Sequence, residues 1–90
     1  MAANFEHYKI FYYVARYGSF TKAAELLYSN QPNITRIIRI LETELDCKLM
    51  QRSNRGITLT EEGERLYRRV AVAFEQIELG EEEVRQSAAL

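Results

Sequence analysis

The sequence predicts a single, mainly α-helical domain made of three short helices, a two-stranded hairpin and a long last helix. Three observations support this fold class. Apolar residues recur at helical spacings of three and four in several separate segments. Two short, partly apolar segments flank a turn-forming quartet, which indicates a hairpin. The length of 90 residues is enough for one small domain but not for two.

The first two helices are placed by their capping residues. Asn4 can cap a helix that ends before Gly18, a residue suited to the left-handed conformation past a helix terminus. We expect Thr21 to cap a second helix over residues 22–28, with Phe20 packing at its entry. The apolar face of the first helix is aromatic and consists of Phe5, Tyr8, Phe11, Tyr12 and Ala15.

The third helix is expected to begin near Gln31, after Asn30 as its cap, and to end near Leu45. Pro32 is acceptable in the first turn, because the amide that it lacks would have no partner within the helix. On a helical wheel the apolar stripe consists of Ile34, Ile38, Leu41 and Leu45, with Ile37 at its border. The opposite face gathers Gln31, Pro32, Thr35, Arg36, Arg39 and Thr43.

A hairpin and a long helix complete the chain. Residues 49–52 and 57–59 flank a turn-rich quartet that ends in glycine. Thr60 is expected to cap the long helix. We therefore divide the chain into a first unit, residues 1–59, and the long helix, residues 60–90. The heptad-like apolar seam of this helix consists of Leu66, Val70, Ala73, Ile77 and Val84.

Composition and charge exclude several classes of protein. With 47% hydrophobic and 28% charged residues, the sequence is typical of a folded domain rather than a disordered one. It lacks the run of about 18 apolar residues that a transmembrane helix requires. Residues 1–59 carry eight Lys or Arg and five acidic residues, whereas residues 60–90 carry four Arg and eight Glu. A polyanionic partner would therefore meet the first two-thirds of the chain.

The sequence contains no catalytic or metal-binding pattern, so we expect no enzyme activity, no metal and no cofactor. His7 is the single histidine and Cys47 the single cysteine, and neither has a second ligand or base nearby in the sequence. One cysteine cannot form an internal disulfide, and the first residues lack the pattern of a secretory signal. We therefore expect a cytoplasmic protein that does not enter a membrane.

The order of a short helix, a tight turn and a helix with polar residues at its start is that of a helix-turn-helix, whose second helix enters the major groove of DNA. Arginine can donate two hydrogen bonds to guanine, and glutamine can pair with adenine. Arg52 and Arg55 flank the hairpin turn, where basic side chains can reach the DNA backbone or a narrow minor groove. The alternative interpretation is an ordinary solvated helix face and a solvated turn arginine.

Residues 19–63 contain motif residues at fixed spacings, which are Ser19-Phe20, Ala23-Ala24, Gln31-Pro32, Ile34-Thr35, Ile38, Leu41-Glu42, Glu44-Leu45, Arg52, Leu59-Thr60 and Gly63. With these residues the chain resembles the winged helix-turn-helix DNA-binding domain of the LysR-type bacterial transcriptional regulators. The family pattern runs S-F-x-x-A-A, Q-P-x-[IL]-[ST]-x-x-[IL], L-E-x-E-L, L-[FL]-x-R and L-T-x-x-G. The resemblance covers nearly the whole chain, residues 5–85.

This resemblance implies sequence-specific binding of double-stranded DNA, with the third helix in the major groove and the hairpin as a wing at the minor groove. It also implies a homodimer that pairs through the long helix and binds an inverted repeat. The implied DNA-contacting residues are Thr21, Gln31, Pro32, Thr35, Arg36, Arg39, Arg52 and Arg55. The implied dimer contacts are Leu66, Val70, Ala73 and Ile77.

Two features depart from the family. Ile37 and Ile40 stand where many members carry Gln, Lys or Arg, and three roles are open for Ile40: a contact with the wing, a contact with a thymine methyl group, or simple exposure. The larger effector-binding domain of the family is absent, so the chain is either a fragment, which is the interpretation we favour, or an unusually short member. We expect a small-molecule inducer only for that domain. The alternative function is a protein-interaction or dimerisation module on a winged-helix scaffold.

Overall fold

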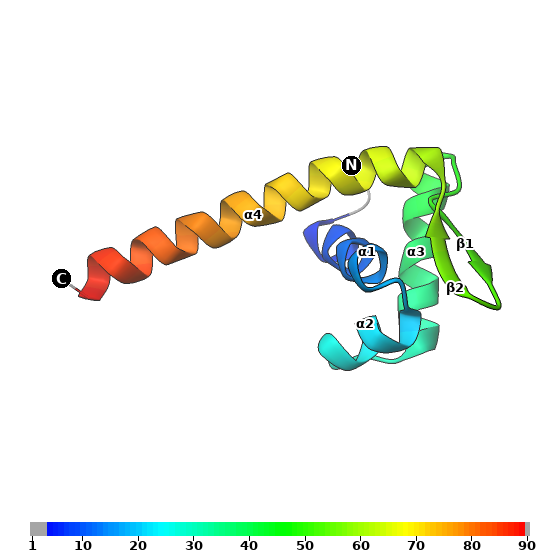
Figure 1. Cartoon of the computed structure of the whole chain (residues 1–90), viewed down its shortest axis with the longest axis horizontal. Coiled ribbons are helices and arrows are strands. Elements are labelled where there is room, and N and C mark those ends of the chain that lie inside the picture. Colours follow the sequence, from blue (N-terminus) through cyan, green and yellow to red (C-terminus); the bar gives the residue numbers. More distant parts are fainter. Residues whose placement is uncertain (1–3, 90) are drawn as a thin grey trace.

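The three short helices pack on one another at one end of the molecule, and the long helix runs across them and away (Figure 1). This is a computed structural model, and it describes residues 4–89. Its elements are α1 (Phe5–Tyr17), α2 (Phe20–Leu26), α3 (Gln31–Leu45), β1 (Met50–Ser53), β2 (Gly56–Leu59) and α4 (Glu61–Ala89). The predicted fold class, a winged helix-turn-helix followed by a long helix, is therefore confirmed.

The predicted ends of α1 and α3 are also confirmed. The side-chain oxygen of Asn4 accepts a hydrogen bond from the amide of His7 at 3.1 Å, and Gly18 past the helix end has a φ of 63°. Asn30 caps α3 in the same way, since its side-chain oxygen accepts from the amide of Asn33 at 2.9 Å. Pro32 stands in the first turn of α3, where its missing amide costs no helical hydrogen bond.

The prediction that Thr21 caps the second helix is wrong. Ser19 is the cap, because its hydroxyl accepts a hydrogen bond from the amide of Lys22 at 3.0 Å. The helix consequently begins at Phe20, whose ring is buried in the core and holds the first turn in place. The helix also ends earlier than expected, at Leu26, and Tyr28 in the following turn has a φ of 54°.

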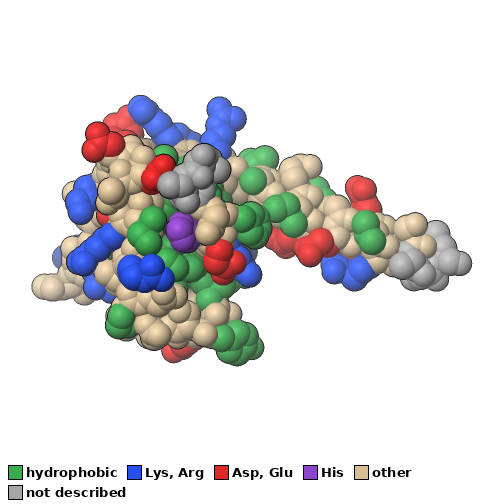
Figure 2. Space-filling view, turned by 180° about the vertical axis from the view of Figure 1, so that it is seen from behind, with side chains coloured by type: hydrophobic (Ala, Val, Ile, Leu, Met, Phe, Trp, Pro, Cys, Tyr) green, Lys and Arg blue, Asp and Glu red, His purple; other side chains and the backbone are tan. Residues whose placement is uncertain are grey.

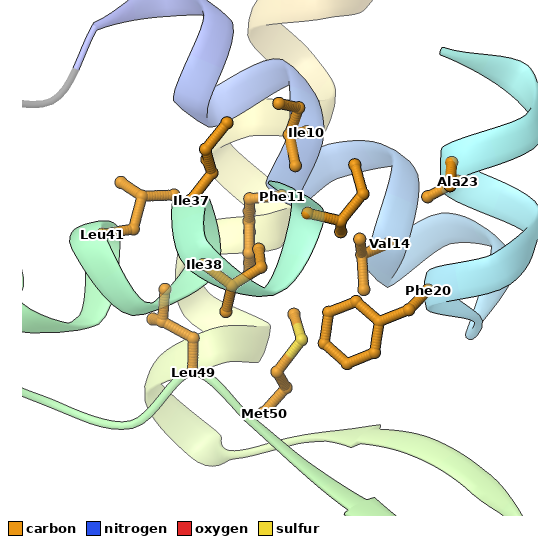
Figure 3. Close-up of a cluster of buried hydrophobic side chains, with 12 residues drawn as sticks. Ile10, Phe11, Val14, Phe20, Ala23, Ile37, Ile38, Leu41, Leu49 and Met50 are labelled. Atoms are coloured by element: carbon orange, nitrogen blue, oxygen red, sulfur yellow. The ribbon is translucent and has the colours of Figure 1, made fainter. Parts of the chain in front are cut away.

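One apolar core joins the three short helices to the approach of β1 (Figure 3). Phe11 and Val14 of α1, Ile34 and Leu41 of α3, and Leu49 before β1 are fully buried. The amide of Leu49 also donates a hydrogen bond at 2.8 Å to the carboxylate of Glu42 on α3. The core and this bond together place the hairpin beside α3.

The buried stripe of α3 differs at two positions from the stripe predicted by the helical wheel. Ile37, expected at the border, is only 5% exposed. Leu45, expected in the stripe, is 40% exposed, because the buried part of α3 ends one turn earlier at Leu41. A wheel gives the direction of a side chain but not how far along the helix the core extends.

The wing is a two-stranded antiparallel hairpin in which Met50 pairs with Leu59 and Ser53 with Gly56. Its second strand leads directly into α4, and the start of this helix is held by two hydrogen bonds of Thr60. The hydroxyl of Thr60 donates to the carbonyl of Lys48 at 2.6 Å and accepts from the amide of Gly63 at 3.0 Å, so Thr60 caps α4 as predicted.

The first half of α4 is held on the domain by an aromatic stack. The ring of Tyr12 on α1 lies 5.7 Å from that of Tyr67 and 4.9 Å from that of Phe74, in both cases nearly parallel. Val70, between these two residues, is 8% exposed. Beyond Phe74 the described side chains of α4 are exposed. In residues 4–89 no helix is both long and apolar enough to cross a membrane.

The predicted apolar seam of α4 is divided by this packing. Leu66 is partly buried against the core of its own domain, and Val70 is buried. Ala73 and Ile77 are exposed, with 43% of Ile77 accessible. The half of the seam nearer the domain therefore packs within the chain, and the other half is exposed.

Replacing Gly63 with alanine should destabilise the domain, because a β-carbon there would collide with the backbone of Leu49. We expect the free energy of unfolding to fall by about 1–3 kcal/mol in urea denaturation followed by circular dichroism. Gly80→Ala is the matched control in the same helix, with open space around its added carbon. It should raise the free energy of unfolding by about 0.5–1 kcal/mol. Unchanged stability of Gly63→Ala would contradict the close contact.

Candidate nucleic-acid interface

The outward face of α3 and the wing border an open groove of about 860 Å³. Figure 1 shows the hairpin alongside α3, which is the arrangement that forms it. The residues that line the groove are Gln31, Pro32, Thr35, Arg36, Arg39, Ile40, Thr43, Glu44 and Arg52. The structure thus brings together six of the eight residues predicted to contact DNA, five from α3 and one from β1.

Side-chain hydrogen bonds organise the start of α3. The amide group of Gln31 donates to the hydroxyl of Thr21 on α2 at 2.7 Å, which links the two helices of the helix-turn-helix. Asn33 donates to the hydroxyl of Ser29 at 2.9 Å and accepts from the guanidinium of Arg36 at 2.8 Å. Arg36 is therefore held in an orientation set by the turn before the helix.

Sequence reasoning missed the role of Asn33 at this site. Its side chain connects Ser29 to Arg36, at separations of four and three residues. The separation of three residues places Asn33 and Arg36 on one face of α3, so this pair was a readable signal. Ser29 lies in the turn before the helix, and its contact with Asn33 follows from the fold of that turn.

Arg52 is the wing residue that the structure places in the groove. Its guanidinium lies 4.0 Å from the centre of the Phe20 ring, a cation–π distance that joins β1 to the start of α2. Arg52 and Thr21 also line a second, smaller cleft of about 250 Å³ between α2 and the wing. Thr21 does not cap α2, but it lies close to both Gln31 and the wing.

Arg55 stands apart from the other candidates. It is exposed in the turn between the strands and does not line the groove. Arg39 lines the groove and is exposed. Within residues 4–89, neither guanidinium has a hydrogen bond or ion pair. Both side chains can therefore reach a ligand without breaking an internal contact.

The groove has a basic character with one acidic group at its end. Arg36, Arg39 and Arg52 bring three positive charges, and Glu44 contributes one negative charge. The positive end of the α3 dipole lies at Gln31, where it also favours anions. His7 and Cys47 do not line the groove. Among the described residues, no three His, Cys, Asp or Glu side chains form a cluster able to hold a metal ion.

Comparisons with known proteins point to one family. Residues 5–64 match the family model described as bacterial regulatory helix-turn-helix protein, lysR family. The chain is 53% identical over 58 residues to the HTH-type transcriptional regulator YofA of Bacillus velezensis, and the aligned segment covers 64% of this chain and 20% of that protein. It is 36% identical over 86 residues to the regulator PcaQ of Agrobacterium fabrum, covering 96% of this chain and 28% of that protein.

Solved structures share the whole fold. A crystal structure of the BenM DBD with catB site 1 DNA superposes with a TM-score of 0.83 at 30% identity, covering 94% of this chain and 96% of that one. A crystal structure of the CbnR DBD–DNA complex gives a TM-score of 0.77 at 34% identity, covering 94% and 98%. The chain spans 20% and 28% of the length of these two curated relatives. By its sequence and its fold, the chain belongs to the lysR family of bacterial regulatory helix-turn-helix proteins.

Proposed function

We propose that this chain binds double-stranded DNA in a sequence-specific manner, as the DNA-binding part of a LysR-type transcriptional regulator. Residues 1–59 would bind DNA, and residues 60–90 would link and pair two subunits. The observation that carries the proposal is the groove between α3 and the wing, where three arginines meet the polar start of a helix. Relatives of the same fold are solved as complexes with DNA. A chromosomal target would place the protein in the cytoplasm.

The geometry suggests a distinct role for each contact. α3 enters the major groove by its N-terminal end, where Gln31 can pair with adenine, while Arg36 and Arg39 can donate to guanine. The Arg36–Asn33 hydrogen bond orients one of these donors before DNA arrives, which lowers the entropy lost on binding. Pro32 and Thr35 border the same face and complete the contact surface on α3.

The remaining candidates lie where the DNA backbone would pass. Arg52 lies against the Phe20 ring and lines one cleft with Thr21, which supports phosphate contacts by both residues. Arg55 at the tip of the wing can enter the adjacent minor groove, where arginine is favoured by the concentrated negative potential. In this scheme the bases are read by α3, and the flanking groups set its register.

The proposed assembly is a homodimer that pairs through α4 and binds an inverted repeat. The outer part of α4 projects from the domain and shows hydrophobic side chains between charged ones (Figure 2). Ala73 and Ile77 are the exposed members of its apolar seam. Two recognition helices in one dimer would contact half-sites about one DNA turn apart or a multiple of that. A small-molecule inducer would act through a part of the regulator outside this chain.

Removing either base-reading arginine should weaken binding to a cognate site. Arg36→Ala and Arg39→Ala should each cost about 1–3 kcal/mol of specific binding free energy in a mobility-shift titration. The melting temperature should not change, because both side chains are exposed. Arg85→Ala is the matched control on the far part of α4 and should bind as wild type does. Wild-type affinity in both groove variants would contradict the proposal.

The salt dependence should separate phosphate contacts from base contacts. The logarithm of the binding constant should fall linearly with the logarithm of salt concentration, because phosphate contacts release counterions. Arg52→Ala should reduce the magnitude of this slope by about one and weaken binding to all sequences alike. Fluorescence anisotropy at several salt concentrations measures both effects. A slope near zero for the wild type would argue for the alternative of a protein-interaction module.

Dimerisation should depend on the exposed part of the seam. Ile77→Glu should shift the sedimentation equilibrium toward monomer and leave the helical signal and melting temperature of the domain intact, because Ile77 is 43% exposed. Val72→Glu is the control, since Val72 is 56% exposed on another face of the same helix. Val70 is unsuitable as a test position for the dimer, because a charge at this buried site would destabilise the domain itself. A wild-type chain that stays monomeric at all concentrations, with and without DNA, would refute the dimer.

A further inference from the structure

Ile40 has an unusual position on α3. Apart from Pro32, it is the only apolar residue among the described residues that line the groove. It is partly buried, yet it is not among the partly buried side chains that pack against the apolar core. Arg36 precedes it by one turn and Glu44 follows it by one turn, and both line the same groove.

The stability of the isolated domain does not account for an isoleucine at this site. A β-branched side chain has a lower helix propensity than Lys, Arg or Gln. An aliphatic side chain that lines an open groove also keeps apolar surface in water, which is unfavourable. The residue can lower its free energy if a ligand covers that surface, and the groove is the proposed DNA-binding site.

We propose that Ile40 contacts the C5-methyl group of a thymine in the major groove and thereby selects a T·A pair in each half-site. This inference rests on the proposed DNA binding. The thymine methyl is the apolar feature of the major groove, and an aliphatic side chain has no hydrogen bond to offer to the other base edges. Arg36 lies roughly 6 Å away along the helix axis. At about 3.4 Å per base pair, the thymine lies within roughly two base pairs of the base that Arg36 reads.

Uracil substitution tests this contact, because it removes only the methyl group. The operator is first obtained by selecting bound duplexes from a random pool with the wild-type chain. Each thymine is then replaced in turn by uracil, and affinity is measured by fluorescence anisotropy. For the wild type, one uracil position in each half-site should weaken binding about fourfold, the value of one buried methyl group. For Ile40→Ala, thymine and uracil at that position should bind equally.

Leu45→Ala is the matched control, because Leu45 is an exposed aliphatic residue of α3 that does not line the groove. It should retain the full uracil effect. Specific binding by the wild type with no uracil-sensitive position would overturn the role of Ile40 and leave the proposed function standing. The same conclusion follows if Ile40→Ala retains the uracil effect. Failure of the wild type to select any sequence would overturn the proposed function itself, and this inference with it.

Discussion

The burial of the inner face of α3 determines the direction of every candidate DNA contact on its outer face. Ile34 and Leu41 are fully buried and pack in one core with Phe11 of α1. Because a helix is rigid about its own axis, fixing this stripe also fixes where Thr35, Arg36 and Arg39 point. Their positions on the helix surface thus depend on apolar packing on the other side of the helix. Arg36 is oriented in addition by its hydrogen bond to Asn33, whereas Arg39 takes its direction from the helix alone.

The wing and α4 depend on the short segment between α3 and β1. The carboxylate of Glu42 accepts a hydrogen bond from the amide of Leu49, and the hydroxyl of Thr60 donates one to the carbonyl of Lys48. Gly63 packs against the backbone of Leu49. One extended segment therefore contacts α3 on one side and the start of α4 on the other. Nearer the tip of the wing, the contact of Arg52 with Phe20 joins β1 to the start of α2. These contacts tie α3, the wing and the start of α4 to one another.

Much of this arrangement could be predicted from sequence, where the signals are local. The cap of α3, the position of Pro32 and the polar face after it follow from spacings of three and four residues. The misplaced cap of α2 shows where local signals fail, since Ser19 and Thr21 are both good caps and the packing of Phe20 decides between them. The exposure of Leu45 and the burial of Val70 likewise depend on where the core ends, a tertiary property that no helical wheel contains.

The aromatic stack of Tyr12 with Tyr67 and Phe74 fixes the first half of α4 to the domain formed by the three short helices. With 29 residues, α4 is about 43 Å long. A tilt of about 5° at its outer end would move the other end by about 4 Å, slightly more than one base-pair step of about 3.4 Å. If two chains pair through this helix as proposed, small angular changes between the subunits would change the DNA register of each domain, with the helix acting as a lever arm.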